Sequence, residues 1–334
     1  MSIQLKRHAN RYGRTVSQLR IATFNLLHGQ PLAEDGAPLP CPPDPGEPLG
    51  EAIAALDADV LAIQEVDRYQ ERSGLVDQAA VAAKAMGAAD WRFAAALHGR
   101  PAPLAGWLAD PSVTGLQVYG PGEADTGTDL PSYGTALLTR LPVRHWRARR
   151  FAPAPFGLPL RVAGRRGLTP VPDEPRVALA AVLEGGNGPF TVVATHLSFV
   201  PGWNMAQLAA IRRWIADLPQ PCLVLGDFNL IGAVPRTVLG GAAALDRDRV
   251  RDVRAARRAR AAVPGPRRRR VREPRPRLHG WYDLAKTPTY PSHRPTVQFD
   301  HVLAMGVPRT AVGPASAPRA AVSDHRPLIV QVSL

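Results

Sequence analysis

The chain has 334 residues, of which 45% are hydrophobic and 21% are charged, and this balance excludes a wholly disordered or a membrane-embedded protein. Its net charge of +13 is concentrated: the 14 arginines and three carboxylates between Arg247 and Arg277 give +11, which leaves +2 for the rest of the chain. Two cysteines, Cys41 and Cys222, are too few for a disulfide framework or a cysteine-based metal site.

The hydrophobic pattern predicts strands and helices along most of the chain. In the first part of the chain we expect a strand over 19–26, a loop over 29–50, a short helix over 51–56, a strand over 59–64, and a helix over 75–86 that stops at Gly87. A long loop over 101–131 follows. In the second part we expect strands over 135–139, 177–183 and 190–195, a helix over 204–218, and strands over 223–225, 297–304 and 328–332. Because strands and helices do not alternate strictly, a simple doubly wound parallel sheet fits this order poorly.

The sequence contains no signal for a membrane span or for secretion. No segment reaches the 18 or more consecutive apolar residues of a membrane-spanning helix. The first twenty residues are polar and basic, without the apolar stretch that follows the charged start of a secretory signal. We therefore expect a cytoplasmic protein with no transmembrane segment.

Polar side chains that can bind a metal or move a proton stand at the ends of six predicted strands. They are Asn25, Glu65, His196, Asp227 together with Asn229, Asp300, and Asp324 together with His325. Strand ends commonly direct side chains into a shared crevice. Carboxylates and amides are ligands of hard cations, so the set suits Mg²⁺, whereas the absence of cysteine from it argues against structural zinc.

Each of these residues also has an ordinary structural explanation. An Asp or Asn after a strand commonly forms a turn or caps a helix, and His196 alone fits a hydrogen-bonded core histidine. Such residues at six strand ends are harder to explain in this way than a residue at one. We therefore expect them to form a single site.

Four motifs in the C-terminal half carry a resemblance to a known family. They are GDFN at 226–229, TYPS at 289–292, QFDHVL at 298–303 and SDH at 323–325. Together with the residues at the strand ends, they resemble the endonuclease/exonuclease/phosphatase superfamily. This group includes DNase I-like nucleases, abasic-site endonucleases, neutral sphingomyelinases and inositol-polyphosphate 5-phosphatases. The resemblance extends from about residue 19 to residue 332.

The resemblance implies an α/β fold, a four-layer αββα sandwich in which two packed mixed β-sheets are flanked by helices. The expected organisation is a polar basic tail over 1–18 and a single catalytic domain over 19–334, with an Arg-rich insert at about 245–278. The resemblance also implies a metal-dependent hydrolase of phosphoester bonds, with Mg²⁺ as the cofactor and Mn²⁺ as a substitute.

The resemblance further assigns a role to each matched position. The residues implied to bind or position the metal are Asn25, Glu65 and Asp324. The residues implied to be catalytic are His196, Asp227, Asn229, Asp300 and His325. Asp227 is expected to orient or deprotonate the attacking water, Asn229 to hold the phosphate, and His196 to contact the phosphate or act as an acid. Asp300 is expected to orient His325.

Two further residues are candidates for contact with the substrate phosphate. Tyr133, in YGTALLTR, stands where family members often place a phosphate-contacting tyrosine, although this chain has Thr135 where the family often has asparagine. Arg176 is the other candidate, and an arginine on an edge strand is the more ordinary explanation for it.

The Arg-rich insert is low in complexity, interrupted by prolines and highly charged, a composition typical of disordered segments. Such an arm suits binding to nucleic-acid phosphates or to an anionic membrane surface, and a tolerated surface insertion explains it equally well. No aromatic residue interleaves with its arginines, so base stacking has little support there. The insert therefore does not identify the substrate.

Three functions are compatible with these observations. The first is a Mg²⁺-dependent phosphodiesterase of the nuclease kind, in which water attacks the phosphate. The second is a phosphodiesterase or phosphatase for phospholipid head groups or small phosphorylated metabolites. The third is a non-catalytic binding protein on the same scaffold, which the intact set of site residues disfavours. The sequence leaves the oligomeric state open.

Overall fold

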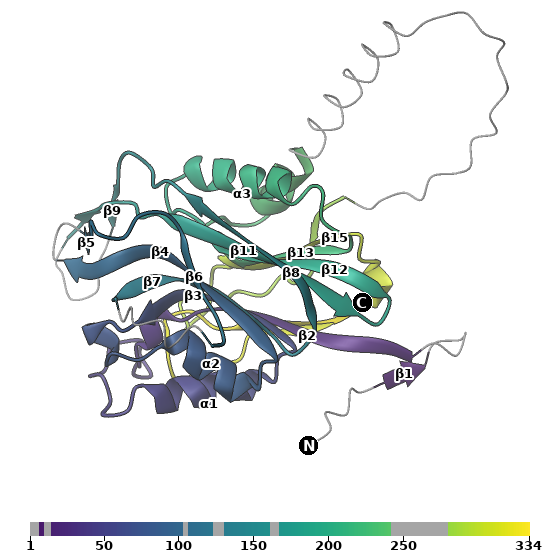
Figure 1. Ribbon diagram of the computed structural model, residues 1–334, viewed down its shortest axis with the longest axis horizontal. Coiled ribbons are helices and arrows are strands. Elements are labelled where there is room, and N and C mark those ends of the chain that lie inside the picture. The colour runs from purple at the N-terminus through teal and green to yellow at the C-terminus, as the bar shows by residue number, and fades with distance from the viewer. Residues whose placement is uncertain (1–6, 10–14, 103–105, 123–129, 161–166, 242–279) are drawn as a thin grey trace, which may run out of the picture.

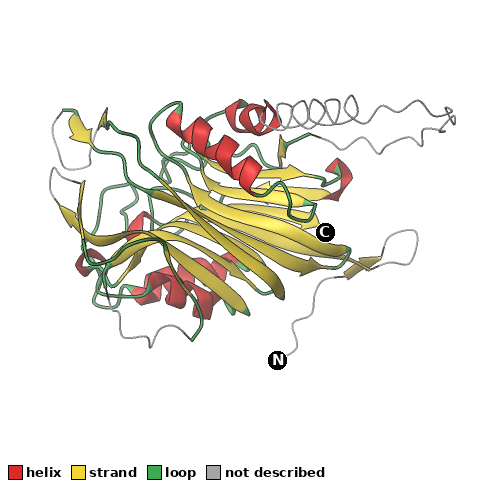
Figure 2. Ribbon diagram, turned by 45° about the horizontal axis from the view of Figure 1, so that its top comes forward, coloured by secondary structure: helices red, strands yellow, loops and turns green. Residues whose placement is uncertain are grey.

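The computed structural model describes residues 7–9, 15–102, 106–122, 130–160, 167–241 and 280–334. The predicted Arg-rich insert at about 245–278 lies outside the described residues. The described chain forms four layers: two β-sheets pack face to face, two helices cover one outer face, and a third long helix with a helical segment over 234–241 covers the other (Figures 1 and 2). This arrangement confirms the predicted αββα sandwich.

The three numbered α-helices are α1 (Gly46–Leu56), α2 (Gln78–Met86) and α3 (Trp203–Trp214), and single 3-10 turns occur at Leu27–Gly29, Glu71–Ser73 and Arg309–Ala311. Helix α2 begins where the Asp77 carboxylate accepts a hydrogen bond from Ala80 N–H. It ends at Gly87, as predicted, because this glycine adopts a left-handed φ of 66°. Within the described residues, none of the helices is long and apolar enough to cross a bilayer.

The first sheet has nine strands. They are β1 (Arg7–Ala9), β2 (Thr15–Asn25), β3 (Val60–Arg68), β4 (Asp90–Ala102), β5 (Gly106–Ala109), β6 (Gln117–Tyr119), β7 (Ser132–Thr139), β16 (Val312–Ser316) and β17 (Leu328–Ser333). The main spatial order is β16–β17–β2–β3–β7–β4–β5, with β1 paired to β2 and β6 paired to β4. Strands β2 and β3 are parallel, and the other pairs are antiparallel.

The second sheet has six strands. They are β8 (Val143–Phe151), β11 (Arg176–Gly185), β12 (Gly188–His196), β13 (Cys222–Asp227), β14 (Tyr282–Asp283) and β15 (Asp300–Met305). Their spatial order is β14–β15–β13–β12–β11–β8, in which β12 and β13 are parallel. A separate antiparallel pair is formed by β9 (Leu158–Leu160) and β10 (Thr169–Val171).

Three apolar cores hold the layers together. In β2, Ile21 packs in the core between the two sheets, whereas Phe24 packs in the core under α1 and α2. In β13, Leu223 faces the first sheet and Val224 faces α3. Central strands buried on both faces lack polar alternation, which explains why the sequence shows them as continuous apolar runs.

The sequence predicts no strand over 90–102 or 143–151, where the structure forms β4 and β8. Strand β8 has no apolar run because it is at the edge of its sheet, where most of its side chains are partly or fully exposed. Strand β4 is rich in alanine, a residue that favours helices, but pairing with β5, β6 and β7 holds it extended. Short strands β5 and β6 lie within the predicted loop, and β2 begins at Thr15 within the predicted tail.

Candidate active site

The predicted site residues meet because strands from both sheets end at the same place. Asn25 is the last residue of β2, and His196 and Asp227 are the last residues of β12 and β13. His196 and Asp227 are direct neighbours in the parallel ladder, and Asp227 is paired across the next strand with Asp300. The register of the second sheet therefore places three of the predicted catalytic side chains next to one another.

Gly226 allows the backbone contact that brings Asp227 beside His196. Its φ is +145°, a conformation that residues with a side chain rarely adopt. A Cβ atom at this position would lie 1.8 Å from the carbonyl oxygen of Thr195 on β12. The glycine of the GDFN motif is therefore required by backbone packing.

Substitution Gly226→Ala is expected to lower the free energy of unfolding by about 3 kcal/mol or more, because the new methyl group must displace a strand backbone. Urea unfolding of both proteins measures this difference. Gly240→Ala is the matched control, since a Cβ there meets no atom within 4 Å. Equal stability of Gly226→Ala and the wild type would contradict this account of the motif.

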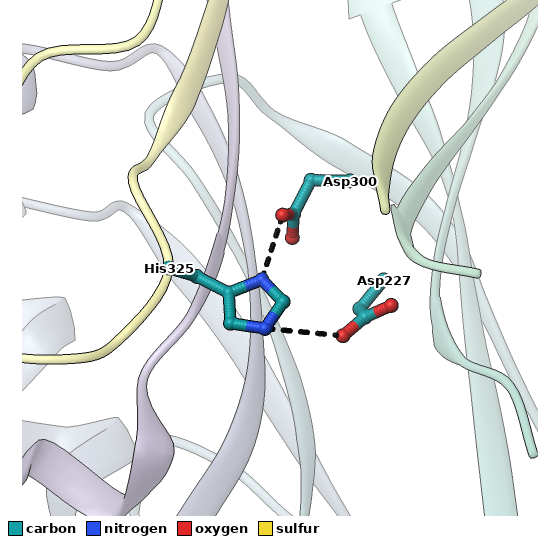
Figure 3. Close-up of side chains that lie close together, drawn as sticks. All are labelled: Asp227, Asp300 and His325. Atoms are coloured by element: carbon teal, nitrogen blue, oxygen red, sulfur yellow. Dashed lines mark hydrogen bonds and ion pairs between the residues drawn. The ribbon is translucent and has the colours of Figure 1, made fainter. Parts of the chain in front are cut away.

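His325 lies between two buried carboxylates (Figure 3). Its Nδ1 is 2.8 Å from Oδ2 of Asp300, and its Nε2 is 3.8 Å from Oδ2 of Asp227. Oδ2 of Asp300 also accepts a 2.6 Å hydrogen bond from the hydroxyl of Thr289, in the TYPS motif. Asp300 therefore fixes the ring so that Nδ1 donates to it, and Nε2 is directed toward Asp227.

The neighbouring carboxylates determine the charge of His325. Burial alone disfavours the imidazolium ion, but the charges of Asp300, Asp227 and Asp324 outweigh burial and raise the pKa to about 10. These groups lie close enough together to hold a metal, since one ligand atom each from Asp227, Asp300 and His325 falls within 4.8 Å of the others. A protonated imidazole has no free lone pair, however, so this cluster fits proton chemistry better than metal binding.

Asn25 connects two carboxylates at the base of the site. Its Nδ2 donates to Oε1 of Glu65 and to Oδ2 of Asp227, both at 3.0 Å. Its Oδ1 accepts from Leu27 N–H at 3.1 Å, which fixes the orientation of the amide. Glu65 lies where the pairing of β3 with β7 shifts register, and its φ is +53°. Such a bulge turns a side chain out of the regular alternation of the strand.

Glu65 and Asp324 form an end of the site that suits a hard divalent cation. Burial raises the pKa of Glu65 to about 7. The hydrogen bond from Asn25 lowers this pKa and offsets burial only in part, whereas the negative charge of Asp324 raises the pKa further. Burial likewise raises the pKa of Asp324. A divalent cation between two carboxylates would relieve both their desolvation and their mutual repulsion, and oxygen ligands are those that Mg²⁺ prefers.

His196 is held in its neutral form. Nη1 of Arg176 lies 2.9 Å from Nδ1 of His196, so the guanidinium donates and Nδ1 accepts. Burial and the charge of Arg176 lower the pKa of His196 well below its usual value. The proton of the neutral ring is therefore on Nε2, which lies 3.8 Å from Oδ2 of Asp227. Nδ2 of Asn229 lies 3.3 Å from Nε2 but is also a donor, and it donates to the carbonyl oxygen of Leu197 at 3.1 Å.

Arg176 is not on an edge strand. It opens β11, which lies between β8 and β12, and its side chain is 4% exposed. Its Nη1 also lies 2.9 Å from Oε1 of Glu174, so the guanidinium is held between Glu174 and His196. The explanation of this residue as an edge-strand arginine is wrong.

The predicted residues border a cleft with a volume of about 730 Å³. Those that line it are Glu65, Tyr133, Arg176, His196, Asp227, Asn229, Asp324 and His325. The other two, Asn25 and Asp300, are 1% and 0% exposed and are hydrogen-bonded to lining residues. The structure therefore brings all ten predicted residues together.

Among the other residues that line the cleft, Arg72, Trp107 and Glu174 carry polar or aromatic groups but belong to no motif in the sequence. Nε1 of Trp107 donates to Oε2 of Glu174 at 2.8 Å, and Arg72 forms an ion pair with Asp67 at 2.8 Å. They come from a 3-10 turn, a four-residue strand and a loop, where no periodicity distinguishes a functional side chain from a surface one. Only their position in the cleft identifies them.

The αββα sandwich and the polar residues gathered at its strand ends define a protein of the DNase I-like class. The chain belongs to the Endonuclease/Exonuclease/phosphatase family, whose sequence profile matches residues 22–325. Members of this family are phosphoester-hydrolysing enzymes and generally depend on a divalent metal. The chain is therefore an enzyme rather than a non-catalytic binding protein.

Solved structures share the fold. The endonuclease/exonuclease/phosphatase from Beutenbergia cavernae DSM 12333 is 18% identical, with a TM-score of 0.50 over 95% of this chain and 72% of that chain. The corresponding protein from Bacteroides vulgatus is 15% identical, with a TM-score of 0.50 over 95% and 99% of the two chains. The family protein from Leptotrichia buccalis C-1013-b is 12% identical, with a TM-score of 0.51 over 95% and 100%. No curated protein sequence matches this chain.

Proposed function

We propose that this enzyme is a Mg²⁺-dependent phosphodiesterase in which water attacks the phosphate. The observation that carries the proposal is the position of His325 between Asp300 and Asp227 at the base of an open cleft. This arrangement supplies an acid and a base on neighbouring side chains, and phosphoester hydrolysis needs both.

The cation would be held by Glu65 and Asp324, with Asn25 positioning the Glu65 carboxylate. When bound, Mg²⁺ supplies positive charge that neutralises the phosphate oxygens, and Mn²⁺ is expected to substitute for it. The negative charges of these two carboxylates repel the anionic phosphate unless a cation lies between them and the phosphate. The position of the cation therefore defines where the phosphate binds.

Asp227 orients the attacking water and accepts its proton. Burial raises the pKa of the Asp227 carboxyl, which makes its carboxylate a stronger base than an exposed one. Its Oδ1 is held by the backbone N–H of Asn229 at 2.9 Å, so Oδ2 is the oxygen that faces the other polar groups. Asn229 is positioned to hold the phosphate through its side-chain amide.

The two histidines have different roles because their charges differ. His325 is an imidazolium whose Nε2–H can donate to the negative charge that develops in the transition state. His196 is neutral, so it contributes an Nε2–H hydrogen bond to the phosphate rather than acting as an acid. Arg176 holds the tautomer of His196 and is a positioning residue.

Removing the metal is expected to abolish turnover. Bis-p-nitrophenyl phosphate, plasmid DNA and a panel of lysophospholipid and sphingomyelin are incubated with the enzyme in Mg²⁺, Mn²⁺ or EDTA, and product is measured. We expect hydrolysis in Mg²⁺, none in EDTA, and recovery when excess Mg²⁺ is returned. Turnover that EDTA leaves unchanged, or no turnover of any substrate by the folded enzyme, would contradict the proposal.

The same panel separates the two substrate classes. Nicking of plasmid DNA would assign the enzyme to the nucleases and give the Arg-rich insert a role in binding phosphates. Hydrolysis of the lipids without DNA nicking would instead support the alternative, an enzyme for phospholipid head groups or small phosphorylated metabolites. We propose that the chain consists of a tail over 1–18 and one catalytic domain over 19–334, and that this domain is responsible for the activity in either case.

A further inference from the structure

The cleft has an apolar end as well as a catalytic end. Its apolar wall comes from the antiparallel pairs β4–β5 and β9–β10, which lie together at one end of the molecule (Figure 1). The apolar residues that line this end are Ala102, Trp107, Leu160, Pro170 and Val171 of these strands and Pro172 directly after β10. A phosphate needs none of these contacts, so this wall is available to the group that the phosphate is attached to.

Trp107 is the part of this wall that lies next to the catalytic end. Its ring packs against the ring of Tyr133, with centroids 4.9 Å apart and an angle of 38° between the planes. Tyr133 in turn is paired with Asp67 across the β3–β7 ladder, two residues beyond Glu65, and both Tyr133 and Glu65 line the cleft. A group stacked on Trp107 would therefore be attached to a phosphate near Glu65.

The Trp107 ring is held in one orientation by polar contacts. Nε1 donates to Oε2 of Glu174 at 2.8 Å, and the Arg72 guanidinium lies 5.1 Å from the centre of the ring. Glu174 is in turn paired with Arg176, the residue that holds the neutral tautomer of His196. An aromatic ring fixed in this way loses little conformational entropy when a ligand stacks on it.

We infer that Trp107 is a specificity-determining residue, which stacks on a flat apolar group, such as an aromatic ring, attached to the phosphate of the substrate. The inference rests on the proposed function, because it names the class of phosphoester that the same cleft accepts. The Arg72 guanidinium lies over the Trp107 ring and helps to hold it, and its charge is already paired with Asp67 at 2.8 Å. The preferred substrate is a phosphoester with an aromatic substituent, in contrast to an aliphatic one.

Binding of phenylphosphonate and methylphosphonate to the full chain in Mg²⁺ tests the inference without requiring turnover. Isothermal titration calorimetry of the wild type should show about tenfold tighter binding of phenylphosphonate, the size expected from a stacked ring and its buried area. In Trp107→Ala this ratio should fall to about twofold or less, with the affinity for methylphosphonate unchanged. Equal affinities in the wild type, or an unchanged ratio in Trp107→Ala, would overturn the inference.

Two further variants separate stacking from the hydrogen bond to Glu174. Trp107→Phe keeps an aromatic face but loses the Nε1 donor, so it should retain most of the phenyl preference. A Phe variant that behaves like Trp107→Ala would overturn the stacking role. Leu108→Ala is the control on the same strand: this side chain is 65% exposed and does not line the cleft, so the ratio should stay at the wild-type value. Failure of the proposed function can be distinguished from failure of this inference. If the proposed function is wrong, the enzyme does not hydrolyse the phosphoesters but still binds phenylphosphonate more tightly than methylphosphonate.

Discussion

Substitution Asp227→Asn is expected to lower kcat/KM for phosphodiester hydrolysis by about 10³-fold, within the range for loss of a general base. The amide keeps the shape of the side chain but cannot accept the proton of the attacking water. The free energy of unfolding at pH 7 should fall by about 1 kcal/mol or more, because both carboxylate oxygens accept hydrogen bonds, from Asn25 Nδ2 and Asn229 N–H, and the new amide NH2 must face one of these donors. Steady-state kinetics and urea unfolding measure the two effects.

The control for Asp227→Asn is Asp217→Asn. Asp217 is exposed and forms an ion pair with Arg147 on the surface, away from the cleft. Its loss should leave kcat/KM at the wild-type value, since exposed ion pairs contribute little. Turnover by Asp227→Asn close to that of the wild type would remove Asp227 from the mechanism.

Substitution His325→Gln is expected to lower kcat by about 10²- to 10³-fold, the usual loss for one donor to a charged transition state. Glutamine can still donate a hydrogen bond but carries no positive charge to set against the developing negative charge. KM should change less than kcat, because the interaction strengthens in the transition state. His145→Gln is the control, since His145 is an exposed residue of β8 and does not line the cleft.

The pH dependence follows from the same histidine. Its pKa is raised from 6.5 to about 10 in the folded protein, so the folded state binds a proton that the unfolded state releases above about pH 6.5. This stabilisation is fully present below pH 6.5 and is lost as the pH rises through about 10. The wild type should therefore lose stability between pH 7 and pH 10, and His325→Gln should lose less. An equal loss in both proteins would show that His325 is not charged in the folded state.

The motif residues could be predicted because each motif is also a local structure. In GDFN, the N–H of Asn229 donates to Oδ1 of Asp227 two residues earlier. In SDH, the hydroxyl of Ser323 accepts from His325 N–H at 3.0 Å, again two residues away. Contacts over such short stretches leave a recognisable spacing in the sequence, and that spacing led to the family, the αββα sandwich and the set of site residues.

The remaining strands could not be predicted, because their apolar contacts come from distant parts of the chain. Strand β8 carries several exposed arginines, and Arg147 is paired with Asp217 seventy residues away. Strand β4 is held extended by β5, β6 and β7. The hydrophobic pattern of a segment depends only on its own residues, whereas its stability as a strand depends also on the strand with which it pairs.

The charges of the two histidines depend entirely on tertiary structure. His196 follows one predicted strand and His325 precedes another, and neither position indicates the charge of the ring. Asp300 and Asp227 surround His325 and hold it as an imidazolium, whereas Arg176 next to His196 keeps that ring neutral. A pKa depends on burial and on charges a few ångströms away, and packing of the two sheets determines both.

The family, the sandwich fold and the ten candidate residues therefore follow from the amino-acid sequence. The protonation of each histidine and the aromatic wall at Trp107 do not, because they depend on contacts between segments far apart in the chain. Trp107 reaches its hydrogen-bond partner Glu174 across 67 positions, and Asn25 reaches Asp227 across 202. Distances of this kind exist only once the two sheets have packed together.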